Sequence, residues 1–406
     1  MPGPAPDGQP APADGGLPDV AIRELTAQRA LSWYLHVPFC RTRCGYCDFN
    51  TYTAGELDGA APQQWADTAI AEVRLARQVL GGVDAPAPTL FFGGGTPTLL
   101  PATELGRVIA AVSAEFGICP GAEITVEANP DDVSAELLDG LLLAGVSRIS
   151  LGVQSADPQT LRTLERSHRA QDLPDVVQRI RAAGVPSMSM DLIYGTPGES
   201  AAQWEATLRT TLALGPDHIS AYCLGIEQGT RLGAALRRGL IRPVDQDEAA
   251  DRYEAADEAL SAHGYSWYEI SNWAKPGQQC RHNLVYWRNG AWWGAGPGAH
   301  SHVGGVRWWN LRHPRGWSAA LQGRTSPAQA REVLSEEQRA EERVLLGIRL
   351  AQGLQVHDLP LGTVTAAGWI NDGLAEWLEH GKSVRLTRSG RLLADMMALQ
   401  ALSATT

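Results

Sequence analysis

The chain of 406 residues is long enough for one large domain and a smaller one, or for two domains of ordinary size. Hydrophobic residues make up 44% and charged residues 19%, a composition typical of globular proteins. The net charge is 34 − 45 = −11, and no run of Lys and Arg is present to attract a nucleic acid backbone. No apolar stretch approaches the roughly 20 residues that span a bilayer. We therefore expect neither a nucleic acid partner nor a membrane span.

Residues 1–28 are expected to form a disordered tail, because the first twenty are rich in Pro, Ala, Gly and Asp. They show neither the basic start nor the apolar core of a secretory signal peptide. We therefore expect a cytoplasmic protein, in which a disulfide framework is unusual. Three of the six cysteines fall within eight residues, and this clustering requires a chemical explanation.

Residues 29–262 alternate short β-rich runs with helical stretches, which is typical of parallel βαβ units in an α/β fold. Residues 63–80 are predicted to form an amphipathic helix, because apolar side chains recur there at helical spacing. Six buried strands are predicted, at 32–39, 89–92, 123–127, 148–154, 187–194 and 218–226. Residues at the ends of these strands would meet at the carboxyl edge of the sheet, where such folds place their chemistry.

The composition changes after residue 262. Residues 263–330 hold eight of the thirteen tryptophans together with many glycines, and we interpret them as a connecting segment. Residues 331–406 are predicted to form a smaller C-terminal domain. Its helices are expected at 341–350, at 373–380 and from Arg391 onward, with a β-like run at 383–386.

The cysteine cluster follows the first predicted strand as Cys40, Cys44 and Cys47, with the spacing C-x3-C-x2-C. Three thiolates on one loop can bind three irons of a [4Fe-4S] cubane and leave the fourth iron without a protein ligand. Such an open iron suggests that another molecule binds there, as at the open position of a catalytic metal. The alternative is a structural zinc site, which would need a fourth ligand such as His36.

The cysteine spacing is the signature of the radical S-adenosylmethionine superfamily, which this chain resembles. Other runs resemble one branch of it, which contains the oxygen-independent coproporphyrinogen III oxidases and the HemW family of haem chaperones. These runs are 34–40, 47–50, 93–98, 126–130, 150–155, 191–195, 268–272, 282–287 and 385–391. The resemblance implies a partial (β/α)6 TIM-like barrel followed by a smaller, mainly helical, HemN-like C-terminal domain.

The resemblance also implies cofactors: a [4Fe-4S] cluster on Cys40, Cys44 and Cys47, with S-adenosylmethionine on the open iron. The positions that would hold S-adenosylmethionine are Tyr34, Tyr46, Gly94, Gly95, Thr96, Glu127, Gln154, Arg166 and Asp191. Four of these positions have a plainer explanation. The glycine run also suits a tight strand-to-helix turn, Glu127 could be a solvated charge at a strand end, and Arg166 could be a surface helix arginine.

Two features bear on which branch member the chain resembles. The oxidases carry a fourth cysteine two positions after the third, where this chain has Phe49. His282 begins an H-N-x-x-Y-W run that resembles the motif associated with haem binding in the chaperones, and histidine is a common haem ligand. Cys280 is another conceivable iron ligand. The neighbouring tryptophans could pack against a porphyrin, or could simply build a packed lid between domains.

The resemblance implies a haem chaperone that binds the cluster, S-adenosylmethionine and haem, and transfers haem to an acceptor protein. An electron donor would be a further partner, and the radical machinery would gate haem transfer instead of turning over a substrate. The alternative is an oxygen-independent coproporphyrinogen III oxidase. A third class, a radical enzyme that modifies tRNA or protein, is disfavoured for tRNA by the acidic composition.

Overall fold

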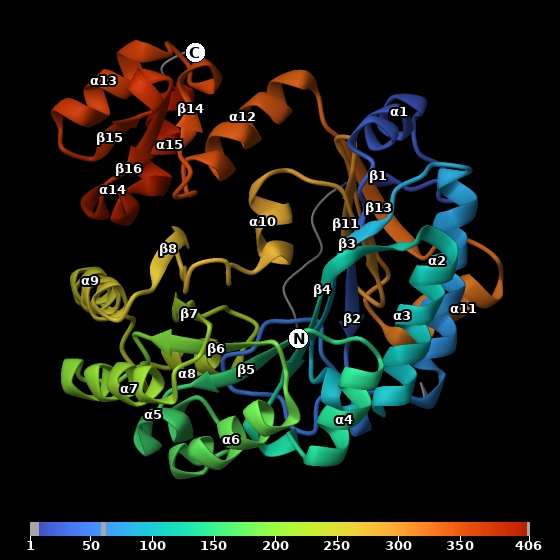
Figure 1. Cartoon of the computed structure of the whole chain (residues 1–406), viewed down its shortest axis with the longest axis horizontal. Coiled ribbons are helices and arrows are strands. Elements are labelled where there is room, and N and C mark those ends of the chain that lie inside the picture. Colours follow the sequence, from blue (N-terminus) through green and yellow to red (C-terminus); the bar gives the residue numbers. More distant parts are fainter. Residues whose placement is uncertain (1–7, 58–61, 404–406) are drawn as a thin grey trace.

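The structure is a computed structural model that describes residues 8–57 and 62–403. Within these residues the main sheet has thirteen strands, in the order β1-β13-β12-β11-β10-β2-β3-β4-β5-β6-β7-β9-β8. Six neighbouring strands are parallel and follow one another in chain order, which confirms the predicted α/β fold (Figure 1). They are β2 (Ser32–Val37), β3 (Ala87–Gly94), β4 (Ile118–Ala128), β5 (Arg148–Gln154), β6 (Ser187–Tyr194) and β7 (His218–Cys223).

Helices cover the outer face of the parallel strands, and Figure 1 shows them as an arc around the curved sheet. They are α2 (Trp65–Leu80), α3 (Ala102–Phe116), α4 (Ala135–Leu143), α5 (Pro158–Thr163), α6 (Leu173–Ala183) and α7 (Ala201–Leu214). The amphipathic helix predicted over 63–80 is confirmed, since α2 buries Trp65, Ala69, Val73 and Leu80 on one face. α8 (Arg231–Arg237) and α9 (Gln246–Ala262) follow β7.

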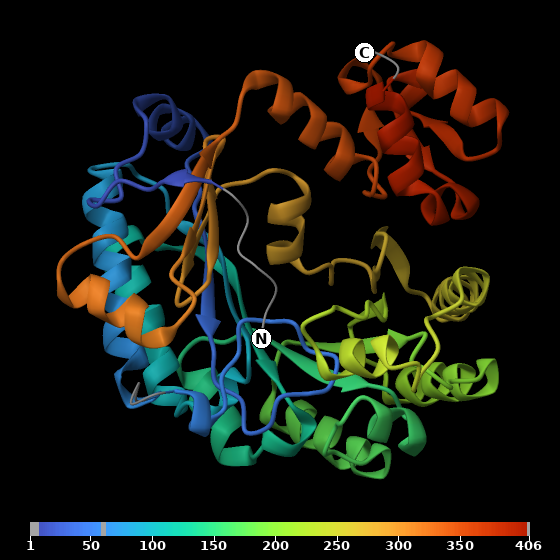
Figure 2. The ribbon, with the colours of Figure 1, turned by 180° about the vertical axis from the view of Figure 1, so that it is seen from behind.

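The Trp/Gly-rich residues 263–330 contribute strands to both ends of the same sheet. Its β10 (Trp292–Ala295) is parallel to β2, and β11 (His300–Val303), β12 (Val306–Asn310) and β13 (Ala328–Val333) follow as antiparallel neighbours. At the other end, β8 (Ser266–Glu269) and β9 (Asn272–Ala274) pair beside β7. Helix α10 (Arg281–Trp287) lies on the inner side of the curved sheet, and α11 (Pro314–Gln322) lies outside (Figures 1 and 2).

The expected disordered tail is wrong for residues 8–28, while residues 1–7 lie outside the described residues. β1 (Gln9–Pro10) pairs with β13, and α1 (Asp19–Gln28) packs against the main core. Ala21 and Leu25 are fully buried, so this segment gains apolar burial that its composition alone does not suggest.

Residues from α12 (Glu336–Gly347) onward build a second hydrophobic core of their own. Helices predominate there: α13 (Thr363–Asn371), α14 (Arg388–Leu392) and α15 (Ala394–Ser403). The helix expected over 373–380 is wrong, because β15 (Ala375–Leu378) pairs with β16 (Ser383–Leu386) in a small sheet with β14 (Leu354–Gln355). Pairing with a strand distant in sequence thus overrides the local helical pattern. Figure 2 shows this domain set beside the main sheet and joined to it through α12.

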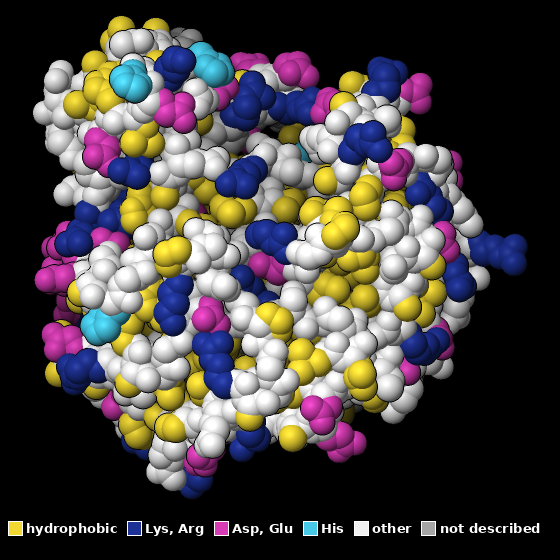
Figure 3. Space-filling model, viewed as in Figure 1, with side chains coloured by type: hydrophobic (Ala, Val, Ile, Leu, Met, Phe, Trp, Pro, Cys, Tyr) yellow, Lys and Arg dark blue, Asp and Glu magenta, His cyan; other side chains and the backbone are white. Residues whose placement is uncertain are grey.

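On the face of the molecule shown in Figure 3, Lys and Arg side chains are scattered, while Asp and Glu gather at the edge formed by α9. No helix within residues 8–57 and 62–403 is both long and apolar enough to cross a membrane.

Candidate functional site

One cavity of about 620 Å³ opens at the carboxyl ends of the parallel strands. All thirteen residues to which the sequence analysis gives a cluster, S-adenosylmethionine or haem role line it. They are Tyr34, Cys40, Cys44, Tyr46, Cys47, Gly94, Gly95, Thr96, Glu127, Gln154, Arg166, Asp191 and His282. The strand ends therefore bring together residues that are up to 248 positions apart, counted from Tyr34 to His282.

The cysteine loop follows β2 and is fixed to the chain that returns beside it. The Cys40 N–H donates to the carbonyl oxygen of Tyr52 (3.0 Å), and the Cys47 N–H donates to that of Cys44 (3.2 Å). Burial, aided by the nearby Cys47 thiol, raises the pKa of Cys40 to about 11, and burial also raises the pKa of Cys47. Both thiols are therefore protonated at neutral pH in the metal-free protein, and iron binding would release their protons.

The donor set on this loop fits a cluster better than zinc. His36 was the candidate fourth zinc ligand, but both its ring nitrogens are engaged, with the Tyr34 hydroxyl (2.9 Å) and the Asn50 carbonyl (2.9 Å). In the described part of the chain, no three His, Cys, Asp or Glu side chains are placed to share one metal ion. A cubane does not require such convergence, because each thiolate binds a different iron.

The glycine run holds the end of β3 against the cysteine loop. The Gly95 N–H donates to the Val37 carbonyl (2.8 Å), and the Thr96 N–H donates to that of Phe39 (2.7 Å). A Cβ atom at Gly95 would lie 2.5 Å from the Phe39 carbonyl oxygen, so only glycine permits this approach. The tight-turn explanation therefore holds, and the same turn presents Gly94, Gly95 and Thr96 to the cavity.

Glu127 and Asp191 place two carboxyl groups at the cavity wall. Glu127 accepts from the Gly94 N–H (3.0 Å), and burial together with the charge of Asp191 raises its pKa to about 8. Asp191 accepts from the hydroxyl of Ser150 (3.1 Å) and from that of Ser220, and burial raises its pKa. A ligand with ammonium or hydroxyl groups would supply the donors that such enclosed carboxylates lack.

Arg166 points into the site and is not a surface arginine. Its guanidinium donates to the Cys44 sulfur (3.6 Å), to the Asn129 side-chain oxygen (2.5 Å) and to the Gly152 carbonyl (2.8 Å). Gln154 ends β5 with a left-handed φ of 62°, an uncommon backbone state for a residue with a side chain.

Sequence reasoning assigned no role to Asn129. Its amide nitrogen donates to the Thr96 hydroxyl (3.1 Å), so Asn129 joins Arg166 to the glycine turn. The available signal was its position two residues after Glu127, at the end of the same strand.

His282 lies at the inner wall, 1% exposed, and both of its ring nitrogens are occupied. The Thr89 hydroxyl donates its one proton to the Ser32 hydroxyl (2.9 Å). Toward His282 the Thr89 oxygen can therefore only accept, and it accepts from Nδ1–H (2.7 Å). Nε2 then accepts from the Tyr286 hydroxyl (2.8 Å), and the ring stacks on Phe91. Haem ligation by His282 stays a prediction, and it would require Tyr286 to leave Nε2.

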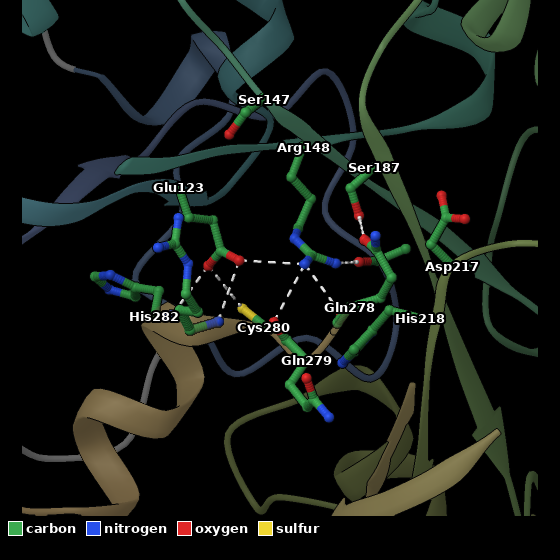
Figure 4. Close-up of polar contacts among 12 residues, drawn as sticks. Glu123, Ser147, Arg148, Ser187, Asp217, His218, Gln278, Gln279, Cys280 and His282 are labelled. Atoms are coloured by element: carbon green, nitrogen blue, oxygen red, sulfur yellow. Dashed lines mark hydrogen bonds and ion pairs between the residues drawn. The ribbon is translucent and has the colours of Figure 1, made fainter. Parts of the chain in front are cut away.

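Glu123 fixes the start of α10, as Figure 4 shows. Its carboxylate accepts from the N–H of Arg281 (3.1 Å), from the N–H of His282 (3.0 Å) and from the Cys280 thiol (3.5 Å). Burial, followed by the charge of Glu123, raises the pKa of Cys280 above its usual range. Cys280 is therefore a protonated packing residue here, not a ready thiolate ligand.

The chain matches known proteins over most of its length. The profile of the Radical SAM superfamily matches residues 34–211. A Heme chaperone HemW of Mycobacterium tuberculosis is 45% identical over 369 residues, which cover 89% of this chain and 92% of that protein. A Heme chaperone HemW of Synechocystis is 38% identical and covers 80% of each chain. The structure of the coproporphyrinogen III oxidase HemN of Escherichia coli matches with a TM-score of 0.80 over 97% of this chain and 95% of that one, at 21% identity.

The fold is that of a radical SAM protein, and the structural likeness to HemN concerns the fold alone. Within that superfamily, the chain belongs to the HemW family. Membership of the superfamily implies a [4Fe-4S] cluster and S-adenosylmethionine as cofactors. Held by the three cysteines, a reduced cluster would supply an electron to the sulfonium of S-adenosylmethionine.

Proposed function

We propose that this chain is a cytoplasmic haem chaperone that receives haem and transfers it to an acceptor protein. Cys40, Cys44 and Cys47 hold the cluster, and the nine residues named for S-adenosylmethionine hold that cofactor beside it. The observation that carries the proposal is that one cavity joins the three thiols to His282 and Tyr286 of the H-N-x-x-Y-W run. Cluster, cofactor and haem can then influence one another directly. The relatives named as haem chaperones over most of the chain support this function.

The chain's own residues would prepare the cavity for these ligands. Arg166 and Asn129 fix the cluster loop and the glycine turn relative to each other. Glu127 and Asp191 offer acceptors for the amino group and the hydroxyls of S-adenosylmethionine. Phe49 is 60% exposed at the cavity opening, and it presents an apolar ring where an oxidase carries a thiol.

The test compares haem binding with porphyrinogen turnover in one preparation. The protein is purified without oxygen, reconstituted with iron and sulfide, and titrated with haem while the visible spectrum is recorded. Parallel samples receive coproporphyrinogen, S-adenosylmethionine and a reductant, and a third set receives an apo-haemoprotein. Stoichiometric haem binding and haem transfer without decarboxylation support the proposal.

Decarboxylation by the wild type without haem binding would instead establish a coproporphyrinogen oxidase. A Phe49→Cys variant is the matched control for the position in which this chain differs from the oxidases. We expect it to remain inactive on coproporphyrinogen, because one added thiol does not supply a porphyrinogen site.

A further inference from the structure

A second cavity, of about 400 Å³, adjoins the cluster cavity, and the cluster and S-adenosylmethionine assignments leave it without a ligand. It lies within the size range of about 300–1,000 Å³ that is usual for small-molecule sites. Five residues line both cavities: Tyr34, Phe49, Gly94, Glu127 and Tyr286. The new part of the wall comes from strands β10 to β12 and the turn after them. It contains Trp292, His300, Trp309 and Arg312.

Two histidines line this second cavity, and their ring nitrogens differ in availability. His36 is already bonded at both nitrogens, as described above. His300 begins β11 and is exposed, and its ring stacks on Trp309 with centroids 5.8 Å apart and planes 25° apart. Among the hydrogen bonds of the described residues, none involves a ring nitrogen of His300. Partial desolvation of the ring, which stacks on Trp309, followed by the charge of Arg312, lowers the pKa of His300, so the imidazole is neutral at pH 7 and offers a lone pair.

The remaining wall suits a flat, partly apolar molecule that carries carboxylates. Phe49 and Trp292 present aromatic surface to the cavity, and Phe49 is the most exposed aromatic side chain of the site. Trp309 is 3% exposed, and its indole N–H has no acceptor among the described residues. Arg312 adds a positive charge beside His300. A guanidinium group is a strong donor to carboxylates.

We propose that His300 is the axial ligand through which this chain holds haem, in the second cavity. The macrocycle packs against Phe49 and Trp292, and its propionate carboxylates lie on the side of Arg312. The assignment rests on the proposed function and gives it a place in the fold. It sets haem directly beside the cofactor cavity, with Tyr34, Glu127 and Tyr286 as the shared wall.

His282 then acts as a positioning residue. Its Nε2 holds the Tyr286 hydroxyl at 2.8 Å, and the Tyr286 ring meets the edge of Trp292 with centroids 4.8 Å apart. The H-N-x-x-Y-W run would therefore shape the haem cavity through Tyr286 without binding iron. A substitution at His282 would weaken haem binding but would leave the ligand of the iron unchanged.

The test is a haem titration of the full-length, cluster-loaded protein, followed by the absorption and electron paramagnetic resonance spectra of the ferric form. For His300→Ala we expect at least a tenfold loss of haem affinity and a shifted Soret band. Added imidazole should restore the wild-type spectrum by filling the vacated place. For His282→Ala we expect weaker binding with an unchanged ligand spectrum. His357→Ala, at an exposed histidine of the C-terminal domain, is the matched control and should behave as the wild type.

Iron content, cluster absorption and thermal melting show whether each variant is folded. If the His300→Ala variant melts at a lower temperature than the wild type, His300→Gln takes its place. Wild-type affinity and spectrum in a folded His300 variant, with loss of the ligand signature in His282→Ala, would overturn the assignment and place the iron on His282. Absence of haem binding in the wild type would overturn the proposed function itself, and the assignment with it.

Discussion

Arg148 and Glu123 form an ion pair inside the sheet, with 3.2 Å between Arg148 Nη2 and Glu123 Oε2 and side chains 5% and 6% exposed. Arg148 also donates to the Ser189 hydroxyl (3.1 Å) and to the carbonyls of Gln278 (3.0 Å) and Gln279 (3.3 Å) (Figure 4). Two neighbouring strands, β4 and β5, thus hold both the chain before α10 and the start of that helix. The position of His282 therefore depends on a charge pair that lies far from it in the sequence.

The first prediction concerns this pair. Glu123→Ala leaves the Arg148 charge and two backbone N–H groups buried without their acceptor. Removal of one partner of a buried pair typically costs about 3–5 kcal/mol. We expect a loss of that order in the free energy of unfolding, measured by denaturant titration of the cluster-free protein. Arg107→Ala, at an exposed pair with Asp67 and Glu104, is the control and should change stability by less than about 1 kcal/mol. Equal stability of the two variants would show that Glu123 does not anchor α10.

The second prediction separates the cluster cysteines from the others. Cys40→Ala, Cys44→Ala and Cys47→Ala should each prevent assembly of a stable cluster, because three thiolates are needed for three irons. Cys119→Ala should retain the cluster, since its thiol donates to the Pro86 carbonyl (3.7 Å), away from the cysteine loop. Iron and sulfide content and the broad visible absorption measure the result after anaerobic reconstitution. Full iron content in any of the three loop variants would contradict the ligand assignment.

The third prediction is a pH dependence at Glu127. Its folded-state pKa is raised to about 8, so the folded protein holds a proton that the unfolded chain releases near 4.5. Between pH 4.5 and pH 8, Glu127 therefore lowers the free energy of unfolding as pH rises, by at most about 1.4 kcal/mol per pH unit. Glu127→Gln removes that slope and still accepts from the Gly94 N–H.

The measurement is the difference in unfolding free energy between Glu127→Gln and the wild type from pH 5 to pH 8, in the cofactor-free protein. We expect the variant to gain stability relative to the wild type as pH rises, and the two to converge near pH 4.5. A constant difference across this range would show that Glu127 is ionised throughout and not enclosed as described.

The sequence predicts the features that depend on local pattern. Buried runs mark the six parallel strands, and the spacing of Cys40, Cys44 and Cys47 marks the cluster loop because all three sit on one short segment. The sequence predicts less where an element forms through contacts with a segment elsewhere in the chain. β15 forms because Ala375–Leu378 meets Ser383–Leu386 across a turn, and α1 is ordered because Ala21 and Leu25 are buried in the core. The cavity around His300 could not be predicted either, since Phe49, Tyr286 and Arg312 meet there only because β10 to β12 lie beside β2 in the sheet.

The run 385–391 near the C-terminus has a structural role that suggests a fourth prediction. Arg391 and Arg388 both pair with Asp257 of α9, with Nη2 of Arg391 and Nε of Arg388 each 2.7 Å from Asp257 Oδ2. Asp257 and Arg391 are both 4% exposed, and Trp273 Nε1–H also donates to Asp257 (2.9 Å). This carboxylate therefore fastens the C-terminal domain to the main sheet and its helices.

Asp257→Asn should loosen that attachment, because the amide leaves the Arg391 charge buried without a counter-ion, at a cost of about 3–5 kcal/mol. We expect faster amide hydrogen exchange in α9, α14 and α15, while β2 to β5 keep their protection. Arg385→Ala is the matched control from the same run, since Arg385 pairs with Glu376 inside the C-terminal domain at a partly exposed site. It should leave exchange in α9 unchanged. If both variants exchange alike, or if protection is lost across β2 to β5 as well, Asp257 stabilises the whole chain and not the junction between its two cores.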